Sequence, residues 1–171
     1  MAVNSVTGID EIKGLAGKDL GKGSWLEITQ ERVNLFADAT DDHQWIHVDP
    51  ERATAGPFGA PIAHGYLTLS LVIPLFSDLL EISGISMGVN YGLDKVRFPA
   101  PVKVGSKIRL AGKVDKVEDV PGGVQMSVDL TIEAEGQEKP ALVARAIYRQ
   151  YALFPRGRCP LRPQLLPQFP P

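Results

Sequence analysis

The residues with the clearest chemical potential lie in two short stretches in the first half of the chain. Asp42 and His47 are five residues apart in a polar cluster, and His64 and Gly65 open a long apolar run. A carboxylate and an imidazole can hold a water molecule between them and move its protons. At a helix that begins near His64 and Gly65, the first backbone N–H groups have no partner within the helix and can stabilise an oxyanion. These residue types therefore predict acid–base chemistry beside an oxyanion site.

A purely structural interpretation of the cluster is also open. Asp41 or Asp42 could end the preceding helix, and His47 could be a buried histidine whose hydrogen bonds are satisfied inside the protein. Trp45 is most simply a packing residue. Spacing alone does not separate this interpretation from the catalytic one.

A metal site is a third interpretation. His43 and His47 are at i and i+4, and Asp42 and His64 could supply further ligands. The i, i+4 spacing needs a helix through the cluster, whereas Asp49-Pro50 predicts that the next helix begins just after it. We therefore expect no metal here.

The run after His64 predicts the element around which the chain is organised. Between Gly65 and Leu80 nearly every side of a helix would be apolar, which is typical of a buried helix. Four polar residues and Pro74 interrupt the run, so it does not predict a membrane span, which needs roughly 18 or more apolar residues. We expect one central helix over about residues 64–80, fully covered by the rest of the chain.

Alternating apolar and polar residues predict long strands in the second half of the chain. The clearest alternation covers residues 124–135, and residues 85–98, 106–118 and 141–151 are further strands. Short turns at 121–123 and 136–139 make consecutive strands antiparallel. Residues 1–18 predict a short amphipathic helix, 25–28 a short strand, and 30–40 a helix capped by Thr29.

A long antiparallel sheet and one buried helix predict an α+β fold in which the sheet wraps the helix. An open sheet edge would remain, and pairing it with a second copy removes it, so we expect a homodimer. The prolines of residues 155–171 exclude a helix or strand of any length, which predicts an extended tail over residues 153–171.

Composition narrows the class of protein. A chain of 171 residues with 44% hydrophobic and 22% charged residues suits one globular domain. The net charge of −2 gives no reason to expect a nucleic acid or an anionic membrane as a partner. One cysteine, Cys159, and the lack of a signal-peptide pattern at the start predict a cytoplasmic protein.

Three motifs carry a resemblance to a known family. They are ADATDDHQWIHVDPERA at residues 37–53, FGAPIAHGYLTLSL at 58–71 and YGLDKVRFPAPVKVGSKI at 91–108. In their order and spacing these motifs resemble the MaoC-like, R-specific enoyl-CoA hydratase family, over about residues 10–152. The resemblance implies a hot-dog fold over residues 1–152, an antiparallel sheet around a long central helix, usually as a dimer.

The resemblance also implies site residues. The family's Asp–His dyad, five residues apart, falls on Asp42 and His47, and the glycine that offers its N–H to the thioester oxygen falls on Gly65. Gln44 stands where the family has asparagine, and we expect it to support the site. For His64 we expect a role in helix capping and positioning.

Two departures from the family pattern bear on the site. The family's proline is Trp45 here, and its usual glycine is Asp41. That substitution places a second carboxylate beside the dyad, where a like charge would raise one carboxyl pKa. We expect Asp41 to point to solvent.

The implied reaction is reversible addition of water to a trans-2-enoyl-CoA, giving the R-3-hydroxyacyl thioester. Asp42 would act as general base, His47 as proton donor, and the Gly65 N–H would hold the enolate oxygen. No dissociable cofactor is expected because CoA, or an acyl carrier protein, is part of the substrate.

Two other functions remain open at this stage. One is a hot-dog thioesterase, which needs a carboxylate in or near the central helix, where only Asp78 is present. The other is a non-catalytic module that binds acyl-CoA or an acyl carrier protein, which Asp41 would favour. The sequence does not fix the acyl chain length.

Overall fold

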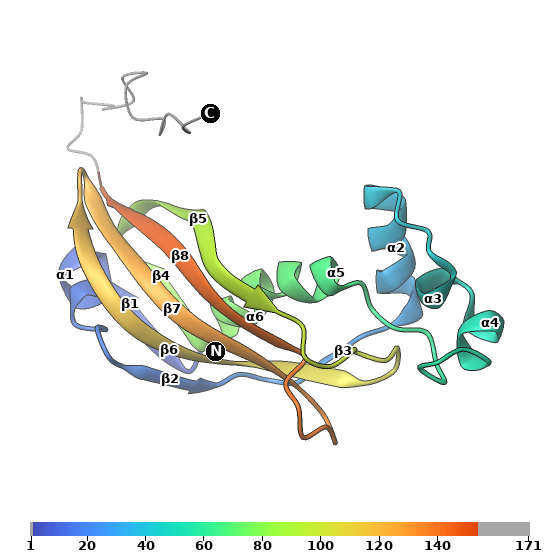
Figure 1. Ribbon diagram of the computed structural model, residues 1–171. Coiled ribbons are helices and arrows are strands. Elements are labelled where there is room, and N and C mark those ends of the chain that lie inside the picture. The colour runs from blue at the N-terminus through green and yellow to red at the C-terminus, as the bar shows by residue number, and fades with distance from the viewer. Residues whose placement is uncertain (1, 154–171) are drawn as a thin grey trace.

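Four long strands in the second half of the chain form most of one curved sheet (Figure 1). The computed structural model describes residues 2–153. The strands are β1 (Asn4–Thr7), β2 (Asp19–Lys22), β3 (Leu26–Glu27), β4 (Leu80–Ser83), β5 (Ile85–Arg97), β6 (Lys107–Val120), β7 (Gly123–Ala134) and β8 (Leu142–Ala152). Strands β1 and β4 lie outside the main sheet and pair with each other. The helices are α1 (Gly8–Lys13), α2 (Gln30–Thr40), α3 (Trp45–Val48), α4 (Pro50–Thr54), α5 (Gly65–Ser70) and α6 (Val72–Leu79).

The main sheet is antiparallel and has the order β2-β6-β7-β8-β5, with β3 also paired to β6. Along β7 the side chains that face the core alternate with outward ones, and Met126, Leu130 and Ile132 are at most 1% exposed. This confirms the period of two predicted from the sequence. In Figure 1 the sheet curls around α6, which is the arrangement of a hot-dog fold.

The central helix differs from the prediction in two ways. It is interrupted at Leu71, so that α5 and α6 are separate, and it ends at Leu79. The interruption lies three residues before Pro74, which has no N–H to donate and whose ring crowds the carbonyl four residues earlier. The helix is also not fully covered, since Tyr66 is 74% and Ile73 47% exposed. The prediction of a wholly buried helix is therefore wrong for the single chain.

The N-terminal segment contains the short helix predicted within residues 1–18, but also a strand that was not predicted. Residues of β1 pair in parallel with β4, which follows α6 directly, and only Gly8–Lys13 is helical. Asn4 fixes this pairing because its side-chain amide donates to the carbonyls of Leu20 and Leu79. The partner strand lies some 75 residues away, so local sequence pattern did not reveal it.

One edge of the main sheet is open in the single chain. Strand β5 pairs only with β8, and its other side has no partner strand among residues 2–153. Large apolar side chains on this strand, Met87, Tyr91 and Leu93, are each more than 40% exposed. The open edge that the sequence predicted is therefore present.

None of the helices between residues 2 and 153 has the length and apolar character that crossing a bilayer requires. The predicted proline-rich tail at 153–171 lies, apart from its first residue, outside the described residues.

Candidate active site

The cluster with acid–base potential lies on a segment outside the sheet. In Figure 1, α2, α3 and α4 stand together beyond the start of α5, at the opposite end of the molecule from α1. Helix α2 begins after Thr29, whose side chain accepts a hydrogen bond from the Arg32 N–H as predicted. It ends at Asp41, which has a φ of 57°. The chain then turns into the four-residue helix α3 that carries His47.

Hydrogen bonds from three segments hold His47. Its side chain is only 6% exposed. The Gln44 carbonyl accepts the His47 N–H at 2.9 Å, and the Gln30 side chain donates to the His47 carbonyl at 2.7 Å. The imidazole Nδ1 lies 2.6 Å from the carbonyl oxygen of Ile62. A carbonyl only accepts, so Nδ1 carries the proton and Nε2 is the nitrogen left for chemistry.

His64 connects the two members of the predicted dyad. Its ring stacks on that of His47, with centroids 3.8 Å apart and planes 28° apart. Its Nε2–H donates to the main-chain carbonyl of Asp42 at 2.9 Å. It is the N-cap residue of α5, but its side chain makes no capping hydrogen bond. His64 therefore occupies the expected N-cap position without a side-chain cap, and its ring makes the contacts of a positioning residue.

The structure brings three of the predicted residues together. One polar side-chain atom from each of Asp42, His47 and His64 lies within 4.8 Å of the others. The two histidines are buried and Asp42 is exposed, so the cluster opens to solvent on the carboxylate side. This geometry lets a water molecule touch both the carboxylate and an imidazole nitrogen.

His43 does not join this cluster. It is exposed and its Nε2 is 3.8 Å from a carboxylate oxygen of Asp38, so the i, i+4 histidine pair considered for a metal is not formed. Asp42, His47 and His64 could still offer three ligand atoms. In each histidine ring one nitrogen already faces a main-chain carbonyl, so each ring has a single nitrogen left for a ligand.

Burial sets the protonation state of the dyad histidine. It lowers the pKa of His47 below its ordinary value of 6.5, and His64 acts in the same direction. The hydrogen bond to Ile62 and the Asp42 carboxylate oppose this shift but are the smaller influences. At pH 7 His47 is therefore neutral, with its single ring proton on Nδ1.

Gly65 is the first residue of α5, and its N–H has no partner within the helix. A Cβ built on Gly65 would meet only the ring of Phe98, at an ordinary 3.5 Å. The residue is exposed, so a ligand can reach its N–H. The side chain of Gln44 makes no capping hydrogen bond, and Gln44 supports His47 through its main chain.

The backbone conformation of Asp41 explains why the family usually has glycine at this position. It ends α2 in the left-handed region, which glycine enters freely and aspartate tolerates better than most residues. Its side chain is exposed, as expected, and is not part of the cluster. Asp41 is thus a substitution that the backbone accommodates.

Sequence reasoning missed the groups that hold the site. The carbonyl of Ile62, which fixes the tautomer of His47, has no side-chain signature. Backbone hydrogen bonds fix the position of this stretch. The Ile62 N–H donates to the Ile46 carbonyl at 3.0 Å, and the Ala63 N–H donates to the Val102 carbonyl at 2.8 Å. The carbonyl of Asp42, which accepts from His64, was equally invisible.

The fold and the cluster define a class of protein: a hot-dog domain with an Asp–His pair beside the first turn of its central helix. Residues 11–136 match the family model described as MaoC like domain. The chain belongs to this family.

The chain is also similar to proteins whose functions have been described. The chain is 53% identical over 145 residues to the 3-hydroxyacyl-thioester dehydratase Z of Mycobacterium tuberculosis, covering 84% of this chain and 96% of that protein. It is 46% identical over 142 residues to Nodulation protein N of Rhizobium leguminosarum bv. viciae, covering 80% and 87%. Among solved structures, the (R)-hydratase from A. caviae involved in PHA biosynthesis superposes with a TM-score of 0.64 at 21% identity, covering 78% and 94%. This last likeness concerns the fold.

Proposed function

We propose that this protein is an R-specific enoyl-CoA hydratase and 3-hydroxyacyl-thioester dehydratase that works through Asp42, His47 and the N–H of Gly65. The observation that carries the proposal is the approach of the Asp42 carboxylate and the His47 imidazole, within 4.8 Å, beside an accessible N–H at the start of α5. The dehydratase relative, which is 53% identical over nearly its whole length, supports the same reaction.

The protonation state of His47 refines the roles expected from the sequence. A neutral His47 with its proton on Nδ1 has no proton on Nε2 to donate at the start of hydration. We therefore assign Nε2 as the first proton acceptor, with the Asp42 carboxylate holding the other hydrogen of the same water. The resulting hydroxide attacks C3, and the electron pair of the double bond moves onto the thioester oxygen.

The second half of the reaction returns the proton. The enolate oxygen accepts a hydrogen bond from the Gly65 N–H, and the nearby carboxylate stabilises the imidazolium. The proton on Nε2 then passes to C2, so that one water has been added across the double bond. In the dehydration direction the neutral Nε2 removes the C2 proton.

The test is hydration of crotonyl-CoA, followed through loss of the conjugated thioester absorbance, with chiral analysis of the product. Asp42→Asn and His47→Ala should each lower kcat by a factor on the order of 100 or more without unfolding the protein. His43→Ala, which changes an exposed histidine outside the cluster, is the matched control and should retain turnover. Near wild-type turnover in either dyad variant would show that the dyad assignment is wrong.

Neither alternative gains support from a specific observation. Asp78, the one carboxylate in the central helix, accepts a hydrogen bond from the Ser24 N–H at 2.6 Å and lies at the far end of the helix from Gly65. Asp41, which favoured a non-catalytic module, is exposed and accommodated by the backbone. Release of free thiol from acyl-CoA would nevertheless identify a thioesterase directly.

We further propose a cytoplasmic homodimer that needs no dissociable cofactor, since the CoA or carrier-protein thiol arrives with the substrate. The unpaired edge of β5 and the exposed side chains of Tyr66 and Ile73 support the second copy. Light scattering on the purified protein should give twice the chain mass. A monomer at micromolar concentration would exclude this assembly.

A further inference from the structure

A side chain of α2, Gln30, holds the main chain of His47. Helix α3 has only four residues, and the residue three positions after His47 is Pro50, which has no N–H to offer the His47 carbonyl. The Gln30 Nε2 donates to this carbonyl at 2.7 Å. The hydrogen bond therefore comes from a neighbouring helix, 17 residues earlier in the chain.

The orientation of the Gln30 amide follows from its two neighbours. A carbonyl only accepts, so the end of the amide that faces His47 is the nitrogen. The same Nε2 also donates to the Asn34 side-chain oxygen at 2.9 Å, one helical turn further along α2. Both hydrogens of the amide nitrogen are thus used, and one of them is used on His47.

The oxygen of the same amide is poorly placed. Gln30 Oε1 is buried and has no hydrogen-bond partner among residues 2–153. A buried acceptor without a partner lowers stability, and most buried polar atoms avoid this state. The amide is therefore a costly packing group, and what it contributes is the donor that it holds against His47.

Gln30 stands next to a firmly attached part of the chain. Two residues earlier, the Ile28 N–H donates to the Ser106 carbonyl at 2.9 Å, and the Ile28 carbonyl accepts from the Gly105 N–H at 2.7 Å. Ile28 is fully buried, and β6 begins directly after Ser106. Gln30 therefore ties the position of His47 to the main sheet.

Two hydrogen bonds at opposite ends of His47 then fix its free ring nitrogen. The ring Nδ1 lies 2.6 Å from the Ile62 carbonyl oxygen, and the main-chain carbonyl accepts from Gln30. We propose that Gln30 is a positioning residue for hydration, whose donor holds the main chain of His47 where Nε2 reaches the water shared with Asp42. This inference rests on the proposed function, because it takes Nε2 as the proton acceptor.

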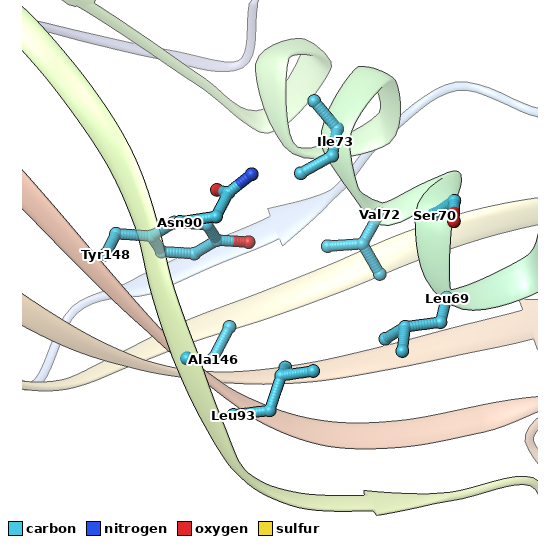
Figure 2. A pocket seen from close by; sticks show the side chains of 9 residues that line it. Leu69, Ser70, Val72, Ile73, Asn90, Leu93, Ala146 and Tyr148 are labelled. Atoms are coloured by element: carbon cyan, nitrogen blue, oxygen red, sulfur yellow. The ribbon is translucent and has the colours of Figure 1, made fainter. Parts of the chain in front are cut away.

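The effect of Gln30 should fall on turnover and not on substrate binding. An apolar pocket of about 350 Å³ lies between the central helix and the strands β5 and β8, and none of its described lining residues belongs to α2 or α3. Figure 2 shows Leu69 and Ile73 on the helix side and Leu93 on the strand side. Under the proposed function this is the acyl pocket, and a change at Gln30 leaves it intact.

Two substitutions of Gln30 test the proposal. Gln30→Met keeps the length of the side chain and removes the donor, and Gln30→Glu keeps its shape and replaces the donor with an acceptor. At pH 8 each should lower kcat for hydration of crotonyl-CoA about tenfold, with KM changed less than about twofold. A packing role predicts instead that Gln30→Glu keeps its kcat.

Stability gives a further distinction. The melting temperature of Gln30→Met should stay within about 5 °C of the wild-type value, because losing the unpartnered oxygen offsets part of the loss of the two hydrogen bonds. If Gln30→Met does not fold, the kcat of Gln30→Glu decides the point.

Asn34 supplies the matched controls. Asn34→Ala removes the other partner of the Gln30 nitrogen, and Asn34→Asp adds the same charge as Gln30→Glu one helical turn away. Both variants leave the donor on His47 and should retain wild-type kcat. Equal losses in Asn34→Asp and Gln30→Glu would show that the charge lowers turnover, and would overturn the proposal.

A spectroscopic measurement does not depend on turnover. The chain has three histidines, so histidine-selective ¹⁵N labelling gives few imidazole signals, and His43→Ala and His64→Gln assign them. The Nδ1–H signal of His47 reports its hydrogen bond to Ile62. It should shift in both Gln30 variants and keep its position in the two Asn34 controls.

The outcomes separate this proposal from the hydratase assignment. If crotonyl-CoA is hydrated and both Gln30 variants keep wild-type kcat, the positioning role is overturned and the hydratase stands. A raised KM with unchanged kcat overturns it as well. If the wild-type protein hydrates no substrate, the His47 signal decides. A shift in both Gln30 variants then supports the positioning contact, and an unchanged signal rejects it.

Discussion

In β7 every second side chain is buried in the core, whereas in the segment from Asp41 to His64 the two buried imidazoles are held by main-chain carbonyls. The first region is specified by a periodic pattern of apolar side chains that any similar residues could satisfy. The second depends on individual hydrogen bonds between parts of the chain that are 15 and 22 residues apart. The sheet should therefore tolerate changes of side chain that conserve volume, whereas the site should lose activity when a single hydrogen-bonding atom is removed.

The largest expected effect on stability comes from the sheet. Leu130 is 1% exposed, and truncation to alanine leaves a cavity against α6 and β6. Leu130→Ala should lower the free energy of unfolding by about 2–5 kcal/mol while the folded fraction keeps its kcat. Urea unfolding followed by circular dichroism measures this. Thr131→Ala, on the opposite face of the strand, is the control, and equal losses in both variants would contradict the assignment of the inner face.

The next largest effect should come from substitutions of His64, which should lower kcat. His64→Phe keeps a ring against His47 but removes the donor to the Asp42 carbonyl, whereas His64→Gln offers a donor and removes the ring. For His64→Phe we expect kcat to fall about tenfold with little change in KM, because the dyad is misplaced but the acyl pocket is intact.

Rescue by His64→Gln distinguishes the two contacts of His64. Recovery of kcat in that variant would show that the hydrogen bond is the important one. An equal loss in both would point to ring stacking. A wild-type kcat in both variants would show that His64 does not position the dyad.

The pH dependence should report on His47. Because burial lowers its pKa below 6.5, the neutral form is favoured in the folded protein. The folded state then binds fewer protons than the unfolded chain, so this contribution to stability is present above pH 6.5 and is lost as the pH falls through the folded pKa. The acid limb of kcat/KM should therefore have its midpoint below 6.5. A midpoint above that value would mean that His47 acts in its protonated form.

The smallest effect should come from Asp41. Its φ of 57° suits glycine, so Asp41→Gly should retain full activity and change stability by less than about 1 kcal/mol. Asp41→Val places a β-branched residue in the same conformation and should cost about 1–2 kcal/mol. Thermal unfolding of the two variants measures the difference. A large loss of activity in Asp41→Gly would show that the carboxylate takes part in the site.

The same contrast explains which features could be predicted from the sequence. Alternation predicted β6, β7 and β8 because side-chain burial in a sheet has a period of two. Residue type and spacing made Asp42 and His47 candidates, and the resemblance to the family assigned them as a dyad. The parallel pairing of β1 with β4, the open side of the central helix and the carbonyl of Ile62 were not found, because each depends on packing between distant segments or on main-chain atoms that all residues share.

The backbone hydrogen bonds at Ile62 and Ala63 affect how the site segment can open locally. Three backbone hydrogen bonds join the site segment to its neighbours: one from the Ile62 N–H to Ile46 of α3, and two around an antiparallel bridge between Ile62 and Lys103 in the stretch before β6. The site segment can thus detach in a local opening that leaves the ladders of the main sheet closed. Amide exchange at Ile62 and Ala63 should accordingly be faster than in β7, and it would measure how often the catalytic geometry is lost in an otherwise folded molecule.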